Sequence, residues 1–181
     1  QEAKPKHTEV SNKDLTWHAI GQLQTNKAKS VASWADVVHS VDRPELVNAL
    51  EKAVVGRATE LAALIQVELD PNPKDNRGGV LPEQALALAK HIAATPGLRL
   101  QGVMGVAPLG GDDALAFTLL QQVAIQIQDF DSQANWISAG MSADFAEAEA
   151  WDRHDVHATS KGLGHSAHER RCGAAEQEEA R

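Results

Sequence analysis

The 181-residue chain has little of what marks several common protein classes. Its single cysteine, Cys172, excludes a disulfide framework and is typical of a reducing compartment. No apolar run approaches the roughly 20 residues that a membrane-spanning helix needs. The first ten residues, QEAKPKHTEV, contain no apolar signal core. We therefore expect a cytoplasmic protein that does not act at a membrane.

Positive charge is also in short supply. The chain has 17 basic and 25 acidic residues, for a formal net charge of -8, so it lacks the basic surface that displaces counterions from nucleic-acid phosphates. Two catalytic patterns are absent as well, the G-x-x-x-x-G-K-[ST] nucleotide loop and the G-x-S-x-G hydrolase elbow. Hydrophobic residues make up 43% of the chain, which is enough to bury the core of one domain.

Short apolar runs alternate with longer helical patterns along residues 1–150. The first helical turns carry proline, as at Pro44, and Asp42 is the expected N-cap of that helix. The run 61–69 is almost continuously apolar, as expected for a parallel strand buried on both faces. The expected strands are 15–20, 37–41, 61–69, 100–106 and 136–138, and the expected helices are 24–34, 44–58, 82–94, 114–130 and 143–150.

Strict alternation of strand and helix predicts an α/β fold with right-handed crossovers and a parallel sheet. Two architectures fit, a (β/α) barrel and a doubly wound open sheet. Both bind ligands at the loops that follow the carboxyl ends of the strands. Residues 151–181 contain very few aliphatic side chains, so we expect an irregular or disordered tail after a domain at 1–150.

The segment 138–142, SAGMS, lies where an expected strand gives way to a helix. A glycine lets the backbone approach an anion, and the first amides of a helix point at it. The Ser142 hydroxyl adds a donor. The segment therefore fits a phosphate-binding turn, and it equally fits an ordinary turn with a serine N-cap.

Several polar side chains occur in the expected strands. His18 either contacts a ligand or is a satisfied core histidine, and Met104 either packs against a planar ring or fills core space. His39 and Ser40 alternate in direction, so at most one of them points inward. Glu68 is either functional or sits at the solvated end of its strand.

The histidines and the cysteine of the tail are the right types for a zinc site, but their spacing matches no structural zinc pattern, and we expect no metal site.

The runs WHAIGQLQTNKAK, VVHSVDR, QVELD, GVMGVAP and SAGMS occur in the same order as in one known family. Together they resemble the pyridoxal phosphate homeostasis proteins, which are small fold-type III proteins related to the barrel domain of alanine racemase. The similarity covers roughly residues 1–150. His18 falls in the family's H-x-I-G-x-L-Q-x-N-K run, Ser40 in its H-S-[VI]-D run, and Gly140 to Ser142 match its G-M-S.

The resemblance implies a TIM-type (β/α) barrel that binds pyridoxal 5'-phosphate (PLP). By this resemblance, the phosphate would be bound by Gly140, Met141 and Ser142, and the pyridine ring would lie against His18 and Met104. The full set of expected cofactor-binding residues is His18, Ser40, Met104, Ser138, Gly140, Met141 and Ser142.

Two departures from the family pattern shape the expectation. The family's Schiff-base lysine and G-E-N motif belong to strands that precede the point where this sequence begins. Its last-strand motif R-[IVL]-G-[TS] has no counterpart in residues 151–181. Since a (β/α)₈ barrel typically needs ~250 residues, we expect about six of eight units, and weak or absent PLP binding.

By resemblance, the expected function is that of a non-catalytic PLP carrier in cofactor homeostasis, either monomeric or weakly self-associating through exposed barrel edges. One alternative is a PLP-dependent, racemase-like enzyme, which needs a lysine and an acid/base partner across the ring. The other is a cofactor-free interaction module or an inactive fragment.

Overall fold

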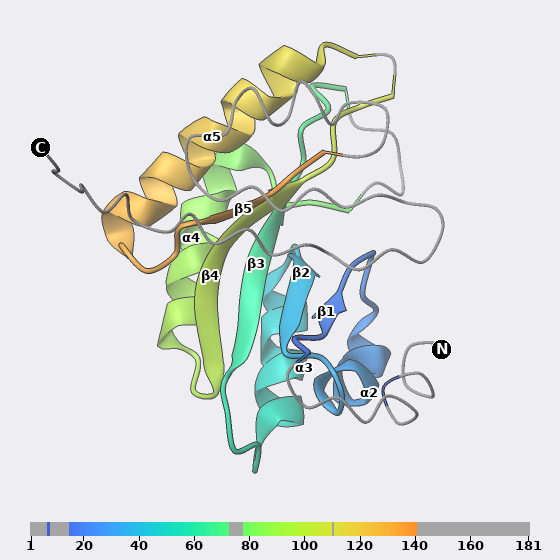
Figure 1. Cartoon of the computed structure of the whole chain (residues 1–181). Coiled ribbons are helices and arrows are strands. Elements are labelled where there is room, and N and C mark those ends of the chain that lie inside the picture. The colour runs from blue at the N-terminus through green and yellow to red at the C-terminus, as the bar shows by residue number, and fades with distance from the viewer. Residues whose placement is uncertain (1–6, 8–14, 73–77, 110, 141–181) are drawn as a thin grey trace, which may run out of the picture.

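Five parallel strands form one sheet in a computed structural model that describes residues 7, 15–72, 78–109 and 111–140. The strands lie side by side in chain order. They are β1 (His18–Ala19), β2 (Val37–Val41), β3 (Leu61–Val67), β4 (Leu98–Gly105) and β5 (Trp136–Ser138). The predicted parallel α/β sheet is therefore confirmed (Figure 1).

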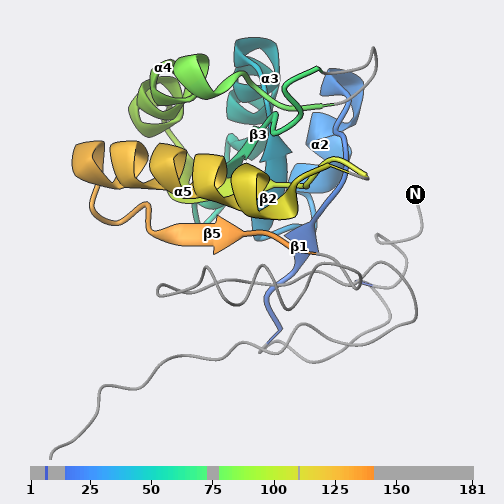
Figure 2. The same ribbon diagram turned by 90° about the horizontal axis from the view of Figure 1, so that it is seen from above.

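The helices decide between the two predicted architectures. They are the 3₁₀ turn η1 (Thr25–Lys27) and the α-helices α2 (Ala28–Ala32), α3 (Pro44–Val54), α4 (Pro82–Ala94) and α5 (Asp113–Phe130). Seen from above, the helices all lie on one side of the sheet (Figure 2). A doubly wound sheet has helices on both faces and a reversal of strand order, so the described residues form part of a (β/α) barrel.

Some element boundaries differ from the predicted ones. The first strand pairs only at His18 and Ala19, because the amide of Trp17 donates to the Asp36 carboxylate (N to Oδ2, 2.9 Å) and Gly21 turns away with φ +108°. The predicted helix 24–34 is split into η1 and α2. The predicted helix 143–150 and the tail 151–181 lie outside the described residues.

Helix starts follow the expected residue chemistry with one correction. Pro44 and Pro82 open α3 and α4, where the missing proline N–H costs no hydrogen bond. Asp42 is not the N-cap of α3: the cap is Arg43, without a side-chain hydrogen bond, because the Asp42 carboxylate accepts from the Arg43 guanidinium instead. At α5, the Asp112 carboxylate caps the amide of Leu115 (3.0 Å).

The two faces of the sheet bury different residues. On the outer face, strand side chains such as Val38, Ala63 and Ile65 pack against the apolar sides of the helices in one large core cluster. The opposite side, which we call the inner face, carries a second cluster of strand residues only: Val37, Ala62, Leu64 and Met104, with Trp136 packed against them. The inner strands β2 and β3 are therefore buried on both faces, as the apolar run 61–69 predicts.

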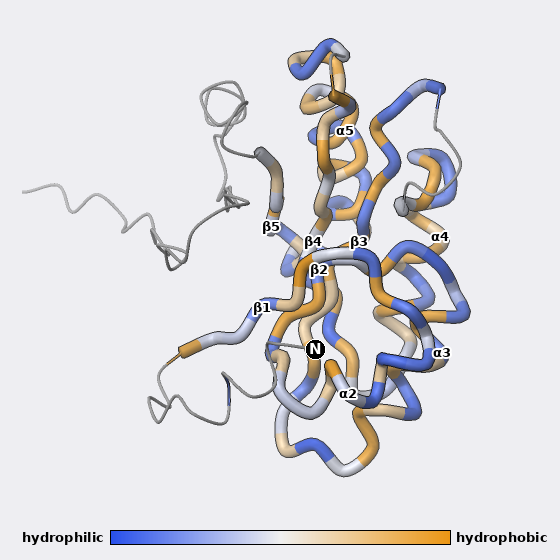
Figure 3. The backbone as a smooth tube through the Cα atoms, turned by 90° about the vertical axis from the view of Figure 1, so that its right-hand side faces the viewer, coloured by the Kyte–Doolittle hydropathy of each residue, from blue (hydrophilic) through white to orange (hydrophobic). Residues whose placement is uncertain are grey.

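Hydropathy along the chain agrees with this arrangement. The tube through α5 changes repeatedly between hydrophobic and hydrophilic residues, as expected for a helix with one buried side (Figure 3). In the described part of the chain, even the 18-residue α5 is not apolar enough to cross a bilayer.

Gly102 allows β4 and β5 to approach each other. The pairing of β3 with β4 skips Gln101 between Ala63↔Leu100 and Leu64↔Gly102, which is a β-bulge. Gly102 has φ +148°, and a Cβ atom at this position would lie 1.9 Å from the Trp136 carbonyl oxygen. Only glycine fits at this point of the sheet.

Replacing Gly102 by alanine is expected to destabilise the fold strongly. The positive φ costs about 1–3 kcal/mol for any side chain, and the overlap with the Trp136 carbonyl adds to that cost. Gly56→Ala is the matched control, because Gly56 also has positive φ (+83°) but has no atom within 4 Å of an added Cβ. Urea unfolding should show a clearly larger loss for Gly102→Ala, and equal losses would contradict the assigned β4–β5 contact.

Candidate functional site

A chain of hydrogen bonds joins three polar side chains on the inner face. His18 on β1 lies 2.8 Å from His39 on β2 (Nδ1 to Nε2). His39 in turn lies 2.9 Å from Ser138 on β5 (Nδ1 to Oγ). Both His39 and Ser138 are almost completely buried. We call these three residues the inner polar cluster.

The contacts of the inner polar cluster show that the sheet is strongly curved. In the sheet, β3 and β4 separate β2 from β5, yet His39 and Ser138 are in hydrogen-bond contact across them. The His18 ring also lies nearly parallel to the Trp136 ring of β5, at 8° and 6.2 Å between centroids. Side chains from the two ends of the sheet therefore meet over its concave face, as in a barrel interior.

An apolar surface adjoins this cluster. Met104 pairs in register with Ser138, and Leu64 and Trp136 pack with Met104 in the inner apolar cluster. The inner apolar cluster therefore offers thioether, aliphatic and indole groups, and the imidazole and hydroxyl groups of the inner polar cluster lie beside it. These are the features of a binding site for a flat ring with polar edges.

Three of the residues predicted from sequence, His18, Met104 and Ser138, thus lie together on the inner face. Gly140 follows β5 with φ +83° and is buried. Met141 and Ser142 lie outside the described residues. Ser40 is buried beside His39, but its hydroxyl has no hydrogen-bond partner among the described residues, and it is not part of the inner polar cluster.

Sequence reasoning missed His39 and Trp136. The structure turns His39 inward, where it contacts both His18 and Ser138. The sequence carries no signal that separates His39 from Ser40, because Val37 and Val38 are both apolar and the register of β2 shifts between Val38 and Val41. Trp136 carries no signal either, because its contact with His18 depends on the curvature of the sheet.

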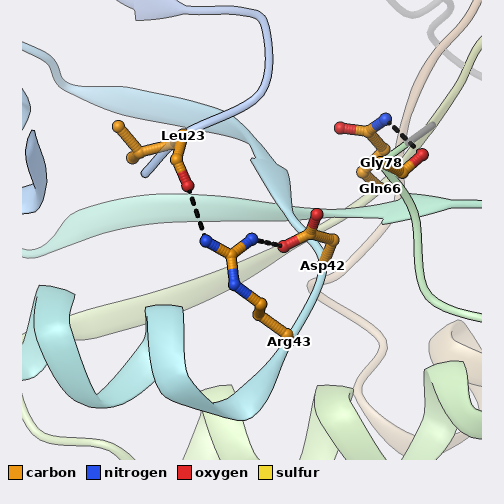
Figure 4. Close-up of polar contacts among 5 residues, drawn as sticks. All are labelled: Leu23, Asp42, Arg43, Gln66 and Gly78. Atoms are coloured by element: carbon orange, nitrogen blue, oxygen red, sulfur yellow. Dashed lines mark hydrogen bonds and ion pairs between the residues drawn. The ribbon is translucent and has the colours of Figure 1, made fainter. Parts of the chain in front are cut away.

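The carboxyl ends of β2 and β3 are tied to neighbouring loops (Figure 4). Besides its bond to Asp42, the Arg43 guanidinium donates to the Leu23 carbonyl oxygen (2.9 Å). The Gln66 side-chain amide donates to the Gly78 carbonyl oxygen (2.8 Å). These bonds hold the loops of the edge where barrel proteins bind their ligands.

A separate groove opens further along the same edge, between the loops after β3 and β4 and the start of α5. It has a volume of about 720 Å³, and leucines such as Leu81, Leu109 and Leu115 form much of its lining. Glu68 lines it just past the end of β3, where its carboxylate accepts from the Asp70 amide (2.9 Å). Glu68 thus belongs to the groove and not to the inner polar cluster.

Among the described residues, no group of three His, Cys, Asp or Glu side chains could hold a metal ion. The histidines and the cysteine of the tail, at which sequence analysis expected no metal site, lie outside the described residues.

Residues 2–160 match the family model described as alanine racemase, N-terminal domain. A pyridoxal phosphate homeostasis protein of Corynebacterium glutamicum is 39% identical over 155 residues, which cover 82% of this chain and 68% of that protein. The chain belongs to this family. The resemblance seen in the ordered motifs is therefore confirmed.

A second member of the family has the same name in Mycobacterium tuberculosis and is 38% identical over 141 residues. That match covers 73% of this chain and 54% of the relative. The chain therefore spans 68% and 54% of the lengths of these two relatives.

Solved structures of a family member give the same fold. PipY of Synechococcus elongatus without PLP has a TM-score of 0.76 and 28% identity, with 86% of this chain and 74% of PipY covered. The structure of PipY with PLP bound has a TM-score of 0.71 and 26% identity, covering 84% of this chain and 71% of PipY. The fold of this chain is that of a PLP-binding barrel protein.

Removing the Ser138 hydroxyl is expected to destabilise the protein, because it removes the buried hydrogen bond between Ser138 and His39. The expected loss is about 0.5–1.5 kcal/mol. Ser40→Ala is the matched control at the position next to His39 on β2, because the buried Ser40 hydroxyl has no hydrogen-bond partner among the described residues, so its removal should be neutral or slightly stabilising. Urea unfolding of both variants measures the difference, and equal stability would contradict the His39–Ser138 hydrogen bond.

Proposed function

We propose that this chain is part of a PLP-binding protein that holds and delivers the cofactor and catalyses no reaction of its own. The observation that carries the proposal is the inner face, where an imidazole–hydroxyl cluster lies beside an apolar floor at the sheet's concave side. The homeostasis proteins among its relatives and the PLP-bound structure of PipY support the same ligand.

The described residues fit the chemistry of this cofactor. Its pyridine ring has apolar faces that suit Met104 and Trp136, and its polar ring edge suits His18. Its phosphate needs hydrogen-bond donors, which Ser138 and the backbone near Gly140 supply, since a glycine at positive φ lets the main chain approach an anion. When bound, PLP supplies an amine-reactive aldehyde and an electron-withdrawing ring. Ser40, Met141 and Ser142 remain predicted contributors to this site.

Non-catalytic binding is favoured over a racemase-like activity by the placement of the lysines. Lys27, Lys29, Lys52 and Lys90, the lysines of the described part, are all exposed and lie in η1, α2, α3 and α4. The helices cover the outer face of the sheet, so none of these amines is a candidate for attack on a carbonyl at the inner face. An enzyme of the racemase type needs both such an amine and a proton donor beside the ring.

The proposal includes a cytoplasmic location and no nucleic-acid partner, in keeping with the single cysteine and the net charge of -8. It also includes a monomer or a weak self-association through β1 and β5, the two edge strands. The alternative of a cofactor-free interaction module would be favoured if PLP produced no spectral change at any concentration.

A PLP titration followed by absorbance tests the proposed ligand. Binding is expected to be weak, and Ser138→Ala should weaken it roughly tenfold, because a hydrogen bond to a charged group is worth about 1.5 kcal/mol. The control is Ser33→Ala, since Ser33 is exposed at the end of α2 and its hydroxyl donates to the Ser30 carbonyl oxygen (Oγ to O, 2.8 Å). Equal affinities for both variants would contradict a role for the Ser138 hydroxyl.

Borohydride reduction in the presence of PLP, followed by peptide mass spectrometry, tests whether this chain attaches the cofactor covalently. We expect no specific adduct at Lys27, Lys29, Lys52 or Lys90, because these exposed lysines lie on the helices that cover the outer face, away from the inner face. Pyridoxine 5'-phosphate, which has no aldehyde, is the matched ligand control. One lysine labelled stoichiometrically at low PLP would overturn the expectation of weak, non-covalent binding.

A further inference from the structure

Both ring nitrogens of His39 are engaged in hydrogen bonds within the sheet. Nε2 faces His18 Nδ1 at 2.8 Å, and Nδ1 faces Ser138 Oγ at 2.9 Å. In a neutral imidazole one nitrogen donates and the other accepts. The proton on His39 therefore determines which of its two neighbours is the donor.

The chain of bonds can run in two directions. If Ser138 donates to His39 Nδ1, then His39 Nε2 carries the proton and donates to His18 Nδ1, which leaves the His18 proton on Nε2. If His39 donates from Nδ1 to Ser138, then His18 must donate from its own Nδ1. In either direction the two rings carry their proton on the same nitrogen, Nε2 in the first case and Nδ1 in the second.

Burial favours the first direction in the ligand-free protein. The Ser138 side chain is almost fully buried, and in the described part of the chain it is hydrogen-bonded to His39. If Ser138 accepted from His39, its own O–H would be a buried donor without an acceptor. A buried unpaired donor is rarer and costlier than an oxygen with an unused lone pair.

An acceptor placed beside Ser138 removes this preference. A phosphate dianion has no proton to donate, so it must accept from the Ser138 hydroxyl. Ser138 can then accept from His39 Nδ1–H, and His39 Nε2 accepts from His18 Nδ1–H. All the bonds then run from His18 towards the phosphate.

We propose that His39 is a positioning residue that couples Ser138 to His18, so that an anion accepting from Ser138 reverses the tautomer of both histidines. The inference rests on the proposed function for the identity of the anion, the phosphate of PLP. In His18, which stacks parallel to Trp136, Nε2 would thereby change from a hydrogen-bond donor before the cofactor binds to an acceptor afterwards.

Imidazole ¹⁵N–¹H correlation spectra of the full chain, labelled in histidine, test the coupling. The chain has eight histidines, so His18→Asn and His39→Asn variants assign the two signals. Without ligand, both rings should be protonated at Nε2. With saturating PLP, and with pyridoxine 5'-phosphate as the aldehyde-free probe, both should change to Nδ1 protonation.

The variants at Ser138 separate coupling from a merely structural role. In Ser138→Ala the ligand-induced change should be lost at His18 as well as at His39, because His39 lies between residue 138 and His18 in the chain of hydrogen bonds. Ser138→Thr keeps the hydroxyl and should retain the change at both rings, which also guards against a folding defect of the alanine variant.

Different outcomes overturn different claims. A His39 ring that is protonated at Nδ1, or at both nitrogens, in the ligand-free protein overturns the assigned direction. PLP binding by absorbance without a tautomer change, or with a change at only one ring, overturns the coupling. No absorbance change at all contradicts the proposed function, and the ligand-free spectra then decide the direction of the hydrogen-bond chain independently.

Discussion

The curvature of the parallel sheet is the constraint on which the remaining features depend. In a flat sheet with the strand order β1 to β5, two whole strands, β3 and β4, would separate His39 from Ser138, and the two side chains would not meet. Their hydrogen bond, and the stacking of His18 on Trp136, exist because the sheet curls until its two ends face each other. Gly102 contributes to this geometry, because its missing side chain leaves room for the Trp136 backbone.

A curved sheet with helices on one side has two different faces to bury. On the outer face, apolar helix side chains such as Leu46 and Ile92 pack with apolar strand side chains such as Val38 and Ile65. The inner face combines a small apolar cluster with polar groups, and the three members of the inner polar cluster are hydrogen-bonded to one another. The inner face thus carries the chemistry, while the outer face provides the bulk of the apolar core.

The sequence predicts much of this fold because parallel strands and amphipathic helices leave strong periodic patterns. The alternation of elements, the buried strand at 61–69 and the helix starts at Pro44 and Pro82 follow from local chemistry. The prediction of Asp42 as the N-cap of α3 was wrong, because the neighbouring Arg43 guanidinium binds its carboxylate. The capping propensity of a residue type does not include such competition.

The candidate site was predictable only in part, for a different reason. His18, Met104 and Ser138 stood out as residues of expected strands and of recognisable motifs. The contact between His39 and Ser138 joins residues 99 positions apart, and it depends on how far the sheet bends between them. Bending accumulates from twist and from irregularities such as the bulge at Gln101, which no short sequence window specifies.

The shortness of β1 has an effect on the dynamics of the site. His18 belongs to a strand that pairs with β2 over only two residues, and the exposed side chains of Leu15 and Ile20 flank it. Segments with so few backbone hydrogen bonds open locally at a small fraction of the global unfolding free energy. The first imidazole of the inner polar cluster is therefore held by the shortest strand of the sheet, while its partners His39 and Ser138 are held in the interior. Local opening of β1 then separates His18 from His39 without unfolding the strands that carry His39 and Ser138.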